Sequence, residues 1–219
     1  MAPQVTYELL RSVFAEDQLI RFPEAGLPAT LTHAPSRAYL TGVGLPAVYN
    51  WLFLPPVWDA DEPLKSVGEV DPYLDDMVDL PADAPDWTVI GDVANDVLAL
   101  DGATGRLWFF PNGEDEIMPC FDRIETLGRF LYVLQRERIE LYGPEEGEEY
   151  ASDSPRAEID RIREELRAIE PGAFADPEGT WARLLQGFRD EWTESVVDQD
   201  GETPPPPGNG EFWVPPHLR

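Results

Sequence analysis

The stretch WTVIGDVANDVLALDGATGRLWFF, residues 87–110, decides the fold class of this chain. Its apolar, β-branched and aromatic runs are typical of strands, and they lie at 87–90, 97–100 and 106–110. Gly91-Asp92 is expected to close the first run, and residues 101–105, DGATG, form the turn between the other two. The stretch therefore predicts three short strands in quick succession.

A further strand and the clearest helix pattern of the chain follow directly. Residues 111–113, PNG, predict a turn, and residues 117–121 predict one more strand. Asp122 is a suitable N-cap for a helix that continues to Tyr142, and one face of that helix carries Ile124, Leu127, Leu131, Leu134 and Arg138. Strands followed by a covering helix predict an α+β fold, in which an antiparallel sheet is packed by helices.

The N-terminal part predicts two helices and one strand. Residues 5–15 place apolar side chains at helical spacing behind Thr6, a plausible N-cap. Residues 19–22 predict a short strand. A second helix should begin after Thr32, with Pro35 in its first turn, and should end near Gly42 or Gly44.

Composition divides the chain into three parts. Residues 1–144 predict the α+β domain, residues 145–197 an acidic hinge and a helical hairpin, and residues 198–219 a proline-rich tail. Ser154-Pro155 and Asp176-Pro177 each combine a capping residue with a first-turn proline, so they are expected to start the two hairpin helices. The proline run of the tail is interpreted as a stiff spacer, with a docking peptide as the alternative.

Charge is the most informative property of the composition. The chain of 219 residues has 43 acidic and 16 basic side chains, a formal net charge of −27. Such a surface repels DNA, RNA and anionic lipid and attracts cationic partners. We therefore expect no direct nucleic-acid contact and no membrane association. With no apolar run of membrane-spanning length and no leader pattern, the chain is expected to be cytoplasmic.

Residues suited to catalysis are scarce. The chain holds two histidines and one cysteine, and neither His33, His217 nor Cys120 has a metal-ligand partner at close spacing. Cys120 is expected to be buried as a small apolar residue. Close carboxylate pairs arise by chance among so many acids, so they do not indicate a hydrolase. We expect no enzymatic activity, no cofactor and no metal.

The segment with the largest excess of acidic over basic residues is the candidate interaction site. Residues 59–86 hold ten acids and one base, Lys65, and are expected to form a loop with short structured pieces. Trp58 precedes them and is a candidate aromatic anchor, with local packing as the alternative. The expected partner-binding residues are Trp58, Asp59, Asp61, Glu62, Asp71, Asp75, Asp76 and Asp79.

Two blocks of the sequence resemble a known family. The first is residues 31–46, LTHAPSRAYLTGVGLP, and the second is the series 89–92, 97–101 and 104–107. Together they resemble the SUKH superfamily, the Smi1/Knr4-like group, and most closely its SUKH-4 branch of immunity proteins. Residues 170–181 are similar to the C-terminal extension of that branch. The resemblance covers about residues 5–192.

The resemblance implies an α+β binding domain without catalysis. Bacterial members of the family neutralise polymorphic toxins by direct binding, and those toxins are often nucleases or deaminases of nucleic acids. A toxin that holds a phosphate backbone must be basic, and an acidic partner would reach it quickly. The expected partner is therefore a basic toxin domain. Two alternatives are a general mimic of nucleic acid and a housekeeping interaction scaffold of the Smi1/Knr4 kind.

Overall fold

The computed structural model describes residues 4–47, 53–57, 59–70, 74, 77–93, 96–111, 115–142 and 155–187. The chain divides into two compact units, Met1–Tyr132 and Val133–Arg219, and the boundary falls within one long helix, α4. Each unit is described by itself. None of the described helices is long and apolar enough to cross a membrane.

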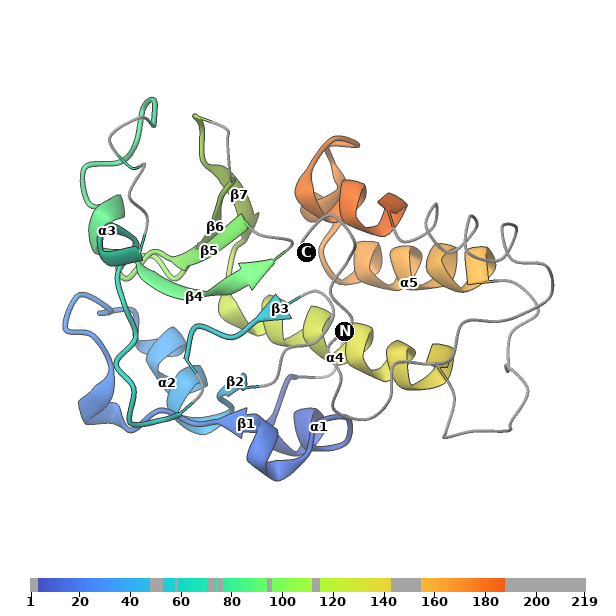
Figure 1. The fold of residues 1–219 in the computed structure, drawn as a ribbon, viewed down its shortest axis with the longest axis horizontal. Coiled ribbons are helices and arrows are strands. Elements are labelled where there is room, and N and C mark those ends of the chain that lie inside the picture. Colours follow the sequence, from blue (N-terminus) through green and yellow to red (C-terminus); the bar gives the residue numbers. More distant parts are fainter. Residues whose placement is uncertain are drawn as a thin grey trace, which may run out of the picture. The chain divides into compact units, whose positions relative to one another are not determined.

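A five-stranded antiparallel sheet forms the centre of the first unit (Figure 1). Its strands lie in chain order, so each pairs with its sequence neighbours, and they are β3 (Phe53–Leu54), β4 (Thr88–Val93), β5 (Asp96–Leu100), β6 (Leu107–Phe110) and β7 (Met118–Phe121). The expected strands and the expected turn at 101–105 are confirmed, as is the α+β class. Pro119 is tolerated in β7 because this strand is an edge of the sheet.

The first predicted strand does not close at Gly91, and this part of the prediction is wrong. β4 continues through Gly91 to Val93, with an irregularity in its pairing to β5 between Val89 and Gly91. Gly91 has a φ of 152°, and a Cβ there would lie 2.5 Å from Cε2 of Phe53 in the neighbouring strand. The glycine thus allows β3 to pack closely against β4 rather than ending β4.

The two faces of the sheet have different covers. Leu107 pairs with Phe121, so both face the same side, and Phe121 contacts Phe130 of α4 (Ile124–Tyr142) edge to face at 4.6 Å between ring centroids. Side chains alternate along a strand, so Trp108 and Phe110 point to the opposite side. There they join the cluster described below.

The N-terminal elements lie in their expected places, although the first helix ends at Arg11 rather than near residue 15 and the strand ends at Ile20 rather than at residue 22. Helix α1 (Tyr7–Arg11) begins after Thr6, whose hydroxyl accepts a hydrogen bond from the Leu9 amide at 3.2 Å. Helix α2 (Ala34–Gly42) carries Pro35 in its first turn, as predicted. The other elements of this part are η1 (Glu16–Gln18), β1 (Leu19–Ile20), η2 (Glu24–Gly26) and β2 (Leu45–Pro46), and β1 pairs with β2 in a separate two-stranded sheet.

The described part of the second unit is helical. Besides the end of α4 it contains α5 (Pro155–Ile169), η5 (Pro171–Phe174) and a helix at 180–187. The expected start of the last helix at Asp176-Pro177 is wrong by three residues. Asp176 instead organises a turn, because its carboxylate accepts from the Glu178 amide at 2.9 Å and its carbonyl from the Gly179 amide at 3.1 Å. Trp181 is buried in this unit.

Candidate partner-binding surface

The acidic segment is anchored to the sheet by its apolar side chains. Within it lie α3 (Val67–Val70) and η4 (Ala84–Asp86). The buried cluster beneath is formed by Val67, Ala84, Trp87, Val89, Ala99 and Phe110, and Leu74, Met77 and Leu80 are partly buried against it. Apolar burial of this kind holds a segment that has little regular structure. The segment is therefore a cover of one sheet face.

Two tryptophans form the floor of this cover. The Trp87 and Trp108 rings stack with centroids 5.8 Å apart, and Phe110 meets Trp87 edge to face at 6.2 Å. The Trp87 indole N–H donates to the Asp83 carboxylate at 3.3 Å. Aromatic packing and this hydrogen bond together fix the C-terminal end of the segment. Trp87 itself is buried.

The acids of the segment point to solvent. All the acidic residues of this segment that the structure describes are exposed: Asp59, Asp61, Glu62, Glu69, Asp79, Asp83 and Asp86. Some also support the backbone: Asp59 accepts from the Asp61 amide at 3.1 Å, and Glu69 accepts from the Ser66 amide at 2.7 Å. This backbone hydrogen bond is the main reason why the pKa of Glu69 lies below its ordinary value. The result is a negative surface on an apolar base.

The expected site residues are only partly placed by the structure. Asp59, Asp61, Glu62 and Asp79 are described and exposed. The other four, Trp58, Asp71, Asp75 and Asp76, lie outside the described residues. Whether any of them contacts a partner stays a prediction.

Two acids that the sequence did not single out join this surface. The Val78 amide donates to the Asp115 carbonyl at 2.7 Å, which brings the connection between β6 and β7 against the acidic segment. Asp115 and Glu116 are both exposed there. The sequence signal was weak, since these two residues lie about thirty positions after Asp86 and only a tertiary contact brings them close.

A shallow groove on the same unit is a poorer candidate. It has a volume of about 520 Å³ and runs along β1, where Arg21 lies 4.4 Å from the centroid of the Tyr7 ring. Its lining includes one acid, Glu16, and one base, Arg21. Because these charges oppose each other, the groove offers no preference for a cationic partner.

No metal centre is evident in the part of the chain that the structure describes. No group of three or more His, Cys, Asp or Glu side chains there is arranged to hold an ion. Cys120 is buried, as expected.

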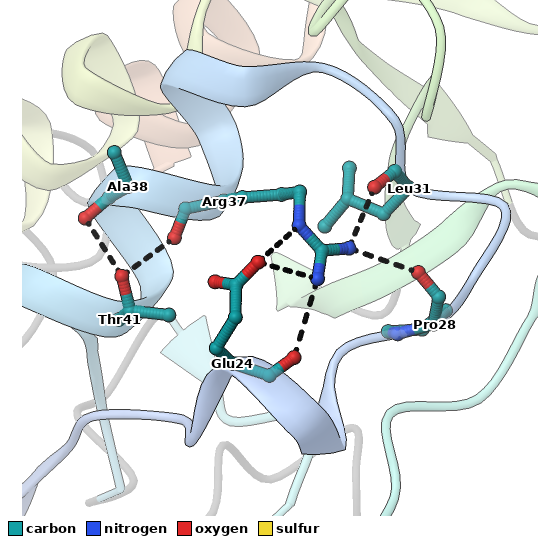
Figure 2. A network of polar contacts seen from close by, with 6 residues as sticks. All are labelled: Glu24, Pro28, Leu31, Arg37, Ala38 and Thr41. Atoms are coloured by element: carbon teal, nitrogen blue, oxygen red, sulfur yellow. Dashed lines mark hydrogen bonds and ion pairs between the residues drawn. The ribbon is translucent and has the colours of Figure 1, made fainter.

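Arg37, in the first of the two quoted sequence blocks, has a structural role (Figure 2). Its guanidinium donates to the Glu24 carboxylate at 2.8 Å, to the Leu31 carbonyl at 2.9 Å and to the Pro28 carbonyl at 3.3 Å. A further bond joins it to the Glu24 carbonyl at 3.2 Å. The fork of donors therefore ties the connection before α2 to the helix itself.

The two quoted blocks meet at one carbonyl group. The Gly102 oxygen accepts from the amides of Thr32 and His33, both at 2.8 Å, and from the Thr32 hydroxyl at 3.2 Å. Gly102 lies in the turn between β5 and β6, so this turn holds the two residues that precede α2. These bonds join the two sequence blocks within the first unit.

A family model described as SUKH-4 immunity protein matches residues 5–187. The chain belongs to the SUKH-4 immunity protein family. This membership confirms the resemblance found in the sequence and indicates an immunity function. Proteins of such families are generally not enzymes, and they imply a toxin as the partner. No curated protein and no solved structure matches the chain.

One carboxylate of this SUKH-4 protein is poised to titrate near neutral pH. Asp92 of β4 is half-buried, and burial, together with the nearby Asp96 charge, raises its pKa to about 6. Because the folded pKa is raised, the stability linked to protonated Asp92 is fully present below its ordinary value of 3.8 and is lost as the pH rises through about 6.

We therefore expect Asp92→Asn to stabilise the protein at pH 7.5 by about 1 kcal/mol, a value reduced for partial exposure. At pH 4 the same variant should gain little, because Asp92 is then protonated in the folded protein. Urea unfolding at both pH values measures the difference. Asp61→Asn removes the same charge from an exposed position and is the control; an equal gain from both variants would assign the effect to net charge.

Proposed function

We propose that this SUKH-4 protein neutralises a toxin by binding and occluding a basic, nucleic-acid-targeting domain, a nuclease or a deaminase. It acts without chemistry of its own and requires no cofactor. The supporting observation is the negative surface of residues 59–86, in which exposed acids lie on an apolar base. A toxin that grips phosphates must present clustered Lys and Arg, and this surface is complementary to them.

Charge complementarity makes a kinetic prediction. Reversing Asp75, Asp76 and Asp79 to lysine should slow association about tenfold at low salt and flatten its salt dependence, because steering by the local field is lost. The matched control reverses Asp17, Glu164 and Glu178, which are exposed and lie elsewhere in the chain. Both variants change the net charge equally, so a slowing confined to the first one locates the interface. Equal slowing of both would attribute the effect to overall charge.

The function itself is tested by a pull-down from cells of the source organism, at low and at high salt, with mass spectrometry of the retained proteins. Retention of one basic toxin-like domain that survives high salt, and protection of cells that express this domain, are the expected results. Release of many unrelated basic proteins by salt would favour mimicry of nucleic acid. A retained housekeeping partner without toxicity would favour the scaffold alternative.

A further inference from the structure

An exposed apolar side chain, that of Val78, lies within the acidic segment. Among the described residues, the large hydrophobic side chains that are exposed are Val78 at 48%, Leu54 at 38% and Val70 at 37%. Val78 is the most exposed of them, and it lies between partly buried Met77 and exposed Asp79. A single exposed valine is ordinary on a protein surface, so its surroundings decide whether it matters.

Val78 is held on a firm support. Its amide bonds to the Asp115 carbonyl at 2.7 Å, and the Met77 amide bonds to the Leu74 carbonyl at 3.2 Å. Met77 and Ile117, on the two segments joined in this way, both pack against the buried cluster below. A side chain whose backbone is already hydrogen-bonded loses less freedom when a partner covers it, which favours tight binding.

Three exposed acids belong to the two segments that the Val78 hydrogen bond joins. Asp79 follows Val78 directly, and Asp115 and Glu116 come from the segment that accepts the Val78 hydrogen bond; all three are exposed. We call the group of Met77, Val78, Asp79, Asp115, Glu116 and Ile117 the Val78 patch. An apolar centre with a charged rim is the usual anatomy of a protein-binding hot spot.

Charge selects one kind of occupant for the Val78 patch. A nucleic acid, an anionic membrane and a second copy of this chain, with its net charge of −27, are all repelled. A protein surface with an apolar recess ringed by Lys and Arg is attracted. The recess fits the apolar Val78 side chain, and the cations fit the acids of the patch. We propose that Val78 is the apolar anchor of the complex, inserted into such a recess on the basic partner, with the three acids paired to cations around it.

This proposal rests on the proposed function and assigns different roles within it. The acids act over distance and set the association rate, whereas Val78 is desolvated only in the docked complex and therefore sets the dissociation rate. Truncating Val78 should leave the salt dependence of association unchanged. Removing the charges of the patch should change it.

The test uses the purified basic protein that the unmodified chain retains at high salt in the pull-down above. Val78→Ser should speed dissociation at least about fivefold in surface-binding kinetics, the effect expected of a buried anchor. Leu54→Ser is the matched control, because it removes an equally apolar exposed side chain outside the patch, and it should change dissociation less than twofold. Thermal melts show that both variants are folded.

The outcomes separate the two proposals. If the unmodified chain binds its partner and Val78→Ser dissociates at the original rate, the anchor is wrong and the proposed function stands. If both serine variants weaken binding equally, Val78 has no special role and the anchor is again wrong. If the unmodified chain retains no basic toxin-like protein at all, the proposed function fails and the anchor fails with it.

Discussion

We expect that replacing Gly128 by alanine destabilises the protein by about 2–3 kcal/mol, although the same change in most helices stabilises them. Gly128 lies in α4, where a Cβ would be 1.9 Å from the Tyr39 hydroxyl oxygen, 3.0 Å from Tyr39 Cζ and 3.3 Å from Val5 Cγ1. Tyr39 is buried in α2 and cannot swing out without leaving a cavity. The clash therefore outweighs the better helix propensity of alanine. Urea unfolding of the full chain measures the effect.

A second substitution checks that the Tyr39 hydroxyl is the cause. This oxygen is buried and has no hydrogen-bond partner among the described residues, and burial raises its pKa above the ordinary value. Tyr39→Phe alone should thus be neutral or stabilising by about 1 kcal/mol. Combined with Gly128→Ala it removes the nearest atom, and the double variant should recover most of the lost stability. Strictly additive effects would mean that the contact does not exist in solution.

Local signals in the sequence predicted local structure well. Thr6 caps α1 and Pro35 starts α2 because capping and first-turn geometry involve only residues a few positions apart. The role of Gly91 was predicted wrongly because a glycine is needed there to make room for Phe53, a residue distant in sequence that packs against it. The Asp176-Pro177 start failed for another reason, since an Asp can equally well organise a turn.

The candidate site was predictable in composition but not in architecture. Ten acids in residues 59–86 marked the segment without structural knowledge. That Val67 and Ala84 anchor it beside Trp87 depends on which sheet face is left open by α4, and no local pattern encodes this. Asp115 and Glu116 enter through one backbone hydrogen bond from Val78, which is a tertiary contact. Charge is thus readable from sequence, whereas the support that presents it is not.

A buried carboxylate in the second unit pairs with arginines, and we expect its removal to lower the free energy of unfolding about as much as Gly128→Ala does. Glu137, in the C-terminal half of α4, is only 1% exposed, and its side chain pairs with Arg136 and with Arg161 of α5. Arg136 also bonds Glu165 of α5 at 2.6 Å. An intact buried ion pair adds little net stability. Removing one partner is nevertheless costly, because the remaining charges then lack the opposite charge that compensated them.

Glu137→Ala should therefore destabilise the protein by about 2–3 kcal/mol. This is at or below the usual cost of breaking a buried ion pair, because both arginines keep some contact with water. Amide hydrogen exchange should accelerate in α5 before it accelerates in the five-stranded sheet. Arg161→Ala alone should cost less, since this side chain is 46% exposed, and adding it to Glu137→Ala should cost little more. Full additivity of the two substitutions would show that Glu137 and Arg161 do not interact. An effect spread evenly over sheet and helices would show that the carboxylate does not act on α5 in particular.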